Sequence, residues 1–319
     1  MELKKVLLIG GGGFVGGWVA SRLSERGIRV IVPTRRRERN KPLIMLPTVY
    51  TVQADVHDEK VLASLMDDVD AVINLAGILH DSNSAQPYGK RFAAAHVELP
   101  KQIVAAMKQT GVRRLVHLSA LKAAVDAPAA YLRSKAAGEA VVLGAASELD
   151  VTVLRPSVIF GPGDAFLSTF ATLLKLFPVL PIAGGQARLQ PVYVGDVADV
   201  VSAGLADDKT FGQTYELCGP TTYTLRELID YVGKLSGRHR CVINLPAPLA
   251  YAQASLLSLL PNPPMTPDDL RMLQVDSVTD GRANFPGWQP RALEAVAPTY
   301  LSPVKLSRRF DGYRRRAGR

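Results

Sequence analysis

The feature that most constrains this chain is a cluster of glycines placed between an apolar strand and a helix. Residues 6–9 predict a buried strand, and five glycines follow within the next seven residues, at positions 10, 11, 12, 13 and 16. A helical pattern begins at once and runs from Phe14 to Arg26. Such a loop lets the backbone approach a pyrophosphate and directs the positive end of a helix toward it. In this strand, loop and helix context, the glycines predict a dinucleotide-binding turn.

Short apolar segments alternate with helical segments through the first half of the chain. The candidate strands cover residues 5–10, 29–34, 49–54, 70–76, 114–119 and 151–155. The candidate helices cover residues 14–26, 59–66, 99–110 and 131–147. Runs of Val, Ile and Leu in the strands indicate burial on both faces, as in a parallel sheet covered by helices on each side. We therefore expect an α/β fold, a Rossmann doubly wound parallel sheet with a smaller C-terminal region.

The pattern changes after Gly161, where proline and glycine become frequent. We expect residues 1–160 to form a dinucleotide-binding domain. Residues 161–319 are expected to form a smaller mixed region, on the substrate or partner side, that packs on the first and returns strands to the sheet near 190–220.

An uncharged helix is expected within residues 241–267. One helical face of it is apolar and consists of Leu249, Ala252, Leu256, Leu259 and Leu260. Prolines limit the helix to about 12 residues, whereas roughly 20 are needed to cross a bilayer. Core or subunit packing is the favoured role of this face. Membrane-surface contact and a lid over an apolar substrate are the alternatives.

The formal charge of +9 is concentrated at the C-terminus. Residues 305–319 contain seven basic residues and one acidic residue, a net charge of +6. This basic tail is interpreted either as an arm that binds an acidic partner or anionic lipid, or as a solvated terminus. No nucleic-acid-binding motif accompanies it, so nucleic acid is not an expected partner.

The two cysteines, Cys218 and Cys241, lack the spacing of a metal site or of a disulfide framework. This indicates an intracellular protein without a metal site, whose redox chemistry comes from a cofactor. The first five residues lead directly into the first strand and are too few for a signal peptide. We expect a cytoplasmic location, with peripheral attachment to the inner face of the membrane as the alternative.

The end of the second strand distinguishes NAD from NADP. An acidic residue about 20 positions after the glycines would bind the ribose 2′-hydroxyl of NAD. Here the chain has Arg35, Arg36 and Arg37, and no carboxylate before Glu38. Guanidinium groups match a 2′-phosphate in charge and geometry, so NADP(H) is favoured and NAD(H) is the less favoured alternative.

Tyr131 and Lys135 lie four residues apart at the start of a predicted helix, and therefore on one face. An ammonium beside a phenol favours the phenolate, which lowers the phenol pKa from about 10 toward neutrality. The tyrosine could then exchange a proton with a substrate hydroxyl or carbonyl.

The surrounding segments resemble the extended and atypical short-chain dehydrogenases/reductases, the group of NAD-dependent epimerases and dehydratases. The resemblance rests on the Gly10-x-x-Gly13-x-x-Gly16 spacing and on residues 131–139, 154–156, 160–164 and 191–198. It implies that Tyr131, Lys135 and Ser119 are catalytic. It also implies that the cofactor contacts are Gly10, Gly13, Phe14, Val15, Gly16, Arg35, Arg36, Asp55, Val56, Leu75, Ala76, Gly77, Lys135, Pro156 and Val158.

Two positions depart from the family pattern. Active extended members generally carry a serine or threonine two residues after Ser119, where this chain has Leu121. His96 stands where many members have a structural asparagine, and we interpret it as a packing or hydrogen-bonding substitution in preference to a proton carrier.

Within the family, residues 131–135, 166–171, 189–194, 246–260 and 265–269 resemble one branch in particular. It is the NADPH-binding accessory subunit of respiratory complex I, with its bacterial relatives, and this resemblance implies a nucleotide with a structural role. Three hypotheses stay open: a cofactor-holding module of such an assembly, a free NADPH-dependent reductase of an apolar carbonyl or quinone-like substrate, and a nucleotide-sugar epimerase or dehydratase.

Overall fold

The computed structural model describes residues 3–81, 86–260, 263, 265–281 and 283–302, so the basic tail 305–319 lies outside the described residues. The chain forms two units. The first consists of Met1–Ser157, Val194–Leu217 and Thr279–Trp288, and the second of Val158–Tyr193, Cys218–Val278 and Gln289–Arg319. Each unit is made of several separate segments of the chain. The expected division into domains at residue 160 therefore stays a prediction.

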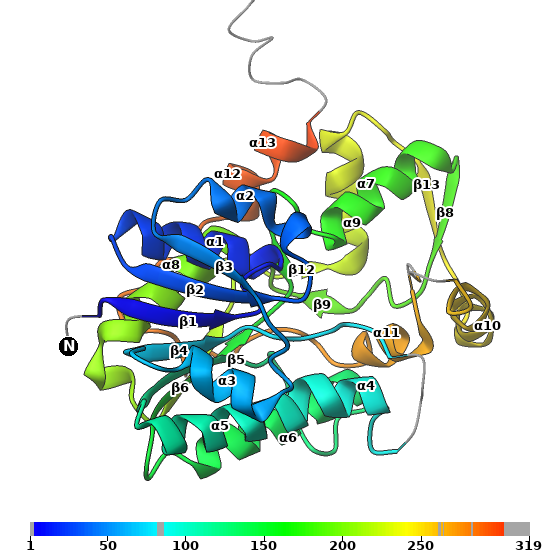
Figure 1. Ribbon diagram of the computed structural model, residues 1–319. Helices are drawn as coiled ribbons and strands as arrows, with labels where there is room; N and C mark the ends of the chain where they lie inside the picture. The colour runs from blue at the N-terminus through cyan, green and yellow to red at the C-terminus, as the bar shows by residue number, and fades with distance from the viewer. Residues whose placement is uncertain (1–2, 82–85, 261–262, 264, 282, 303–319) are drawn as a thin grey trace, which may run out of the picture. The chain divides into compact units, whose positions relative to one another are not determined.

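A seven-stranded parallel sheet forms the centre of the first unit, with the order β11-β6-β5-β4-β1-β2-β3 (Figure 1). Its strands are β1 (Lys5–Ile9), β2 (Arg29–Thr34), β3 (Val49–Gln53), β4 (Ala71–Asn74), β5 (Arg114–Leu118), β6 (Asp150–Pro156) and β11 (Gln213–Leu217). All six predicted strands are present, and β11 adds a strand beside β6. The predicted doubly wound Rossmann fold is confirmed.

Helices cover both faces of this sheet, as the alternating sequence predicts (Figure 1). Leucines, valines and methionines of α3 (Glu59–Leu65), α5 (Leu99–Thr110) and α6 (Ala130–Gly144) pack with the sheet in one buried cluster. Helices α1 (Phe14–Glu25) and α8 (Val194–Ala206) lie against each other. Shorter segments are α2 (Lys41–Ile44), α4 (Lys90–Phe92) and a π-helix, η2 (Ala93–Glu98), which leads into α5.

The second unit contains three pairs of short strands: β7 (Ile159–Phe160) with β10 (Val192–Tyr193), β9 (Arg188–Leu189) with β12 (Tyr223–Thr224), and β8 (Val179–Ile182) with β13 (Cys241–Asn244). Its helices are α7 (Phe166–Leu176), α9 (Leu225–Leu235), α10 (Ala247–Leu257), α11 (Pro267–Met272), α12 (Leu293–Val296) and α13 (Pro298–Leu301). None of the helices in the described ranges is both long and apolar enough to cross a membrane.

The uncharged helix predicted within residues 241–267 is α10, but core packing of its apolar face is wrong. Leu249, Ala252, Leu256, Leu259 and Leu260 are all exposed. The helix buries Ala250 and Ala254 instead, because these small side chains allow it to lie close to the rest of the second unit.

A buried arginine joins α8 to the sheet of the first unit. Arg114, on β5, donates hydrogen bonds to the carbonyl oxygens of Gly204 at 2.5 Å and Leu205 at 3.0 Å, in the last turn of α8. The same guanidinium binds the Thr152 hydroxyl at 2.8 Å and lies 4.6 Å from the centre of the Phe211 ring. Burial lowers its pKa to about 10. A cation at the C-terminal end of α8 also complements the helix dipole.

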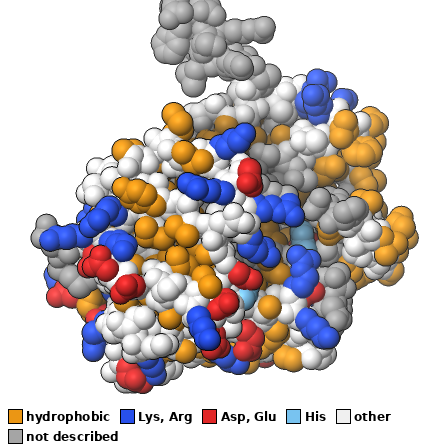
Figure 2. All heavy atoms as spheres, viewed as in Figure 1, with side chains coloured by type: hydrophobic (Ala, Val, Ile, Leu, Met, Phe, Trp, Pro, Cys, Tyr) orange, Lys and Arg blue, Asp and Glu red, His pale blue; other side chains and the backbone are white. Residues whose placement is uncertain are grey.

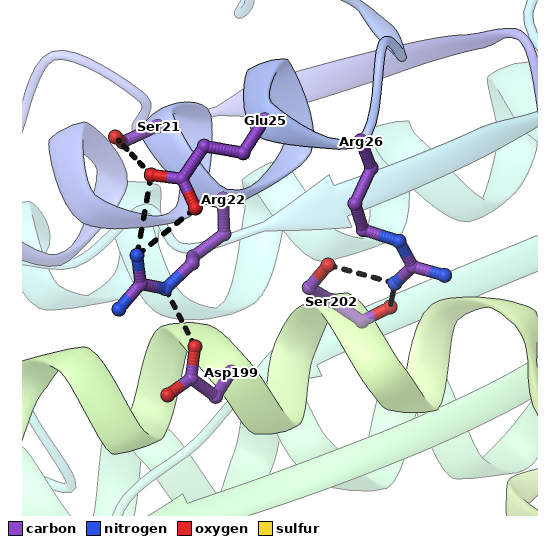
Figure 3. Close-up of polar contacts among 6 residues, drawn as sticks. All are labelled: Ser21, Arg22, Glu25, Arg26, Asp199 and Ser202. Carbon is purple, nitrogen blue, oxygen red and sulfur yellow. Dashed lines mark hydrogen bonds and ion pairs between the residues drawn. The ribbon is translucent and has the colours of Figure 1, made fainter.

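The partner of α8 is α1, the helix that follows the glycine loop, and polar contacts hold the two together (Figure 3). Arg22 Nε donates to Asp199 Oδ1 at 2.6 Å. Arg26 Nη1 donates to the carbonyl oxygen and hydroxyl of Ser202, at 2.5 and 2.9 Å. Because Arg114 fixes α8, these contacts also fix the direction of α1.

We expect Arg114→Leu to lower the free energy of unfolding by about 3 kcal/mol, since buried carbonyl groups lose charged hydrogen-bond donors. Arg113→Leu is the matched control, because Arg113 is exposed and makes only a 3.4 Å surface contact with Asp150. It should cost less than about 1 kcal/mol. Denaturant-induced unfolding measures both variants, and equal losses would show that Arg114 does not have this role.

Candidate nucleotide site

The glycine loop connects β1 to α1 through close backbone contacts. Gly10 has a φ of +82°, and a Cβ there would lie 2.8 Å from the backbone nitrogen of Ala76. A Cβ on Gly16 would lie 2.3 Å from the carbonyl oxygen of Gly10. Gly13 is the N-cap of α1, and no side chain of the described residues caps that end. The first-turn N–H groups, including those of Phe14 and Val15, are therefore available to an anion.

A residue that the sequence analysis missed lies against this loop. Asn40 is buried, and a Cβ on Gly12 would lie 2.3 Å from its Oδ1 atom. Its Nδ2 atom donates to the Thr34 hydroxyl at 2.8 Å, so Asn40 links the glycine loop to the end of β2. Only the extra glycine at position 12 could have signalled this contact in the sequence.

The three arginines after β2 have different environments. The Thr34 hydroxyl donates to the carbonyl oxygen of Arg36 at 3.2 Å and so orders the turn. Arg37 Nε donates to the Thr51 hydroxyl at 3.3 Å. Arg35 and Arg36 are exposed, and their side chains have no hydrogen bond or ion pair with the described residues. Two unpaired cations thus lie at the end of β2.

The other expected cofactor contacts occupy strand ends. Leu75, Ala76 and Gly77 follow β4, and the Leu75 N–H donates to Ile9 of β1 at 2.9 Å. Asp55 is exposed after β3, while Val56 packs against the core cluster. Pro156 ends β6 and accepts a hydrogen bond from the N–H of Leu121. Val158 belongs to the second unit.

Lys135 is buried on α6 and points to the ends of the central strands. Its Nζ donates to the carbonyl oxygen of Leu118, at the end of β5, at 3.0 Å. A Cβ on Gly77 would lie 3.2 Å from that Nζ, so glycine leaves room for the ammonium. Burial lowers the pKa of Lys135 to about 8, although the nearby Glu139 opposes the shift. The structure therefore brings Lys135, Gly77 and the end of β5 together.

Tyr131 lies one turn before Lys135 and is half-buried. The expected lowering of its pKa is wrong, because burial raises the pKa of the phenol to about 12. Desolvation disfavours the phenolate, and the ammonium that should stabilise it is itself buried and bound to a carbonyl group.

His96 connects the loop after β4 to α6. Its Nε2 accepts the N–H of Ile78 at 3.1 Å, so the proton of the neutral ring is on Nδ1, which lies 2.8 Å from the Ser134 hydroxyl. Ser134 in turn donates to the carbonyl oxygen of Tyr131 at 2.7 Å. Burial and the charge of Lys135 lower the pKa of His96 to about 2. His96 is therefore a neutral hydrogen-bonding link in this structure.

The end of the 131–139 segment, which contributes to the family resemblance, also has a structural basis. A Cβ on Gly138 would lie 1.8 Å from the carbonyl oxygen of His96, so α6 can approach η2 only with glycine there. Glu139 is buried, and both its oxygens accept hydrogen bonds from Arg155 of β6, at 3.1 and 3.0 Å. These contacts fix α6 at the depth where Lys135 reaches β5.

Ser119 supplies a test of whether a dinucleotide fits here. Its side chain is buried directly after Leu118, and its Oγ atom has no hydrogen-bond partner among the described residues. A buried hydroxyl without a partner is costly, and a polar ligand group would relieve that cost. Together with the glycine loop, this fits a nicotinamide dinucleotide. Leu121 is buried and brings no hydroxyl.

The lowered pKa of Lys135 predicts a pH dependence of stability. The unfolded chain binds this proton up to its ordinary pKa of 10.5, and the folded chain only up to about 8. The free energy of unfolding of the protein, relative to that of Lys135→Met, should therefore rise by about 2 kcal/mol between pH 8 and pH 10. Denaturant unfolding at several pH values measures the difference. A constant difference would show that Lys135 titrates normally.

Comparison with known proteins places the chain in a family. The model of the "NAD dependent epimerase/dehydratase family" matches residues 6–218. Subunit 9 of the mitochondrial NADH dehydrogenase [ubiquinone] 1 alpha subcomplex is 32% identical in Arabidopsis thaliana, over 85% of this chain and 69% of that protein. The mouse protein of the same name is 29% identical, over 96% of this chain and 80% of that protein.

A solved structure shows the shared fold. UDP-glucose 4-epimerase from Thermotoga maritima superposes with a TM-score of 0.73 over 93% of this chain and 97% of its own, at 18% identity. The identity is too low to carry more than the fold. From the family match and the 32% identity to the plant subunit, this chain belongs to the NAD-dependent epimerase/dehydratase family and, within it, to the group that contains subunit 9 of the mitochondrial NADH dehydrogenase alpha subcomplex.

Proposed function

We propose that this chain holds NADP(H) as a bound nucleotide that stabilises its fold, as a module of an assembly related to respiratory complex I. The observation that carries the nucleotide part is the pair of exposed guanidinium groups of Arg35 and Arg36 after β2, which have no partner among the described residues. Thr34 and Asn40 order that turn next to the glycine loop. A 2′-phosphate offers the charge and the oxygen acceptors that such a pair lacks.

Different residues of the first unit would bind different parts of the nucleotide. The glycine loop and the first turn of α1 would bind the pyrophosphate, Arg35 and Arg36 the 2′-phosphate, and Asp55 with Val56 the adenine side. Lys135 would bind the nicotinamide ribose, while Leu75, Ala76, Gly77 and Pro156 would border the rest. The contact expected at Val158, a residue of the second unit, stays a prediction. A bound nicotinamide supplies hydride transfer when a substrate is present.

A structural role is favoured over turnover by two features of the chain. Leu121 brings no hydroxyl to the position that orients the substrate oxygen in active relatives, and burial raises the pKa of Tyr131 to about 12. A phenol with that pKa remains protonated at neutral pH, so it would not act as a base, although it could donate a proton. The plant and mouse relatives reported above are named as subunits of a mitochondrial NADH dehydrogenase [ubiquinone], which supports a module over a free enzyme.

The membrane part of the proposal rests on charge. The basic tail 305–319, with its net charge of +6, would bind anionic headgroups at the inner face of a membrane.

A free NADPH-dependent reductase of an apolar carbonyl is the second candidate. It is favoured by the pairing of Tyr131 and Lys135 on one face of α6, with Ser119 beside them. A protonated phenol can still donate its proton to a carbonyl oxygen as hydride arrives.

The first experiment concerns cofactor choice. Replacing Arg35 and Arg36 with alanine should weaken NADPH binding by roughly tenfold to hundredfold or more, and NADH binding far less, because only NADPH carries the 2′-phosphate. Arg29→Ala is the control, since Arg29 is an exposed arginine at the other end of β2. Calorimetry measures both nucleotides. Equal losses for NADPH and NADH would overturn the assignment.

The second experiment separates a structural nucleotide from a reacting one. Gly13→Val places a branched side chain where the pyrophosphate would approach, so the increase in melting temperature with NADPH should disappear. At about 100 times the Kd, that increase corresponds to roughly 2.7 kcal/mol. Gly17→Ala is the matched control, because a Cβ at position 17 meets nothing within 4 Å.

Tyr131→Phe tests whether the phenol takes part in a reaction. It should keep the stabilisation by NADPH, and neither it nor the unaltered protein should oxidise NADPH against a panel of carbonyls and quinones. Robust oxidation that falls by about 10²- to 10⁴-fold in Tyr131→Phe would identify a reductase in place of a structural module.

A further inference from the structure

Helix α10 of the second unit buries its small side chains and exposes large apolar ones, which is the reverse of a core helix. It buries Ala250 and Ala254 against Ala183 and Leu270. Two of its three leucines point outward: Leu249 is 59% exposed and Leu256 is 69% exposed. Directly after the helix, Leu259 is 80% exposed and Leu260 is 49% exposed. Burying a leucine is favourable by about 1.5 to 3 kcal/mol, so four exposed leucines indicate an external apolar surface.

The exposed apolar surface continues onto neighbouring elements of the second unit. Strand β13, which leads into α10, pairs with β8, and Ile243 and Val179 on these strands are exposed. Leu176 and Phe177 are exposed where α7 ends before β8. Hydrophobic side chains gather at the right-hand edge of Figure 2, where Figure 1 shows α10 and the β8–β13 pair. We call these residues the apolar face: Leu176, Phe177, Val179, Ile243, Leu249, Leu256, Leu259 and Leu260.

Basic residues accompany the apolar face. The segments that carry the whole face, residues 165–195 and 231–267, contain five lysines and arginines and neither aspartate nor glutamate. The acidic residues just outside the second segment are paired, Asp230 with Arg226 and Asp268 with Arg271. Lys175, Lys234 and Arg238 are exposed. Arg240 is partly buried and donates to the carbonyl oxygen of Leu174 at 3.1 Å, at the end of α7. A positive border thus accompanies an uncharged aliphatic centre.

An aliphatic face with a basic border can be compared with the surfaces that it could bind. Protein interfaces depend on tyrosine, tryptophan and arginine at their centre, whereas Phe177 is the only aromatic residue of the apolar face. A second copy of the chain would bring two positive borders together. Aliphatic side chains with a basic border are what an anionic bilayer surface binds. We propose that the apolar face docks the second unit on anionic lipid, with the leucines of α10 inserted below the headgroups.

The proposal is independent of the nucleotide, and co-sedimentation of the full chain with vesicles tests it. The vesicles are phosphatidylcholine with or without phosphatidylglycerol. The protein should bind the anionic vesicles, and Leu256→Gln with Leu259→Gln should weaken that binding at least about tenfold. The control is Met45→Gln with Val125→Gln, which removes side chains of the first unit that are 82% and 83% exposed. The control should bind as the unaltered protein does.

A second pair of variants tests the basic border. Lys175→Gln with Arg238→Gln should weaken binding to anionic vesicles by roughly 20-fold at low salt, and less at high salt, where charges are screened. Lys60→Gln with Lys90→Gln, two exposed lysines of the first unit, is the charge-matched control. Equal losses in the two pairs would show a general charge effect and overturn the assignment of this border.

Three other outcomes overturn the proposal. They are no vesicle binding by the intact protein, binding that disappears entirely when residues 305–319 are removed, and a dimer that the leucine variants abolish while vesicle binding is unchanged. All variants should keep the affinity of the intact protein for NADPH. A failure of this proposal therefore leaves the proposed nucleotide function untouched, and a failure of nucleotide binding leaves the vesicle result valid.

Discussion

The first unit depends on the absence of a side chain at Gly16. A Cβ there would lie 2.3 Å from the carbonyl oxygen of Gly10, so any other residue would separate α1 from the end of β1. Gly10 has the same role toward the next strand, because a Cβ on it would lie 2.8 Å from the nitrogen of Ala76. The two contacts place the start of α1 and the segment after β4 around one point. The contacts of α1 with α8, and of α8 with Arg114, then fix that geometry.

A second group of contacts holds α6, and the same contacts limit its chemistry. Gly138 lets the helix approach η2, Glu139 binds Arg155, and His96 links Ser134 to Ile78. The helix therefore lies deep enough for Lys135 to reach the carbonyl oxygen of Leu118. That depth removes water from Tyr131 and Lys135, which raises the pKa of the phenol and lowers the pKa of the ammonium. Desolvation disfavours the charged form of each group, so it moves the phenol pKa away from neutrality and the ammonium pKa toward it.

In the second unit, the packing of α10 leaves apolar side chains exposed. Helix α10 uses alanines where a core helix would use leucines, because a close approach to the rest of the unit requires small side chains. Leu249 and Leu256 are left exposed, on a helix too short to cross a bilayer. The exposed leucines form part of the surface of the second unit. The candidate nucleotide site depends instead on backbone contacts in the first unit. The two features can therefore serve the same protein separately: in our proposals, one unit binds a nucleotide and the other provides a surface for attachment.

The sequence alone determined the fold of the first unit, because glycine spacing and alternating apolar segments are local properties that strand and helix geometry fix. It also placed Tyr131 one turn before Lys135 and located three arginines after β2. Only the tertiary structure decided how these groups behave. Burial, which depends on neighbours distant in the chain, raises the pKa of Tyr131, in contrast to the lowering expected from Lys135 alone. Contacts between distant segments also placed Asn40 beside Gly12 and turned the leucines of α10 outward. An apolar helical face in a sequence shows that burial is favourable, but it does not show whether the chain itself or another surface provides it.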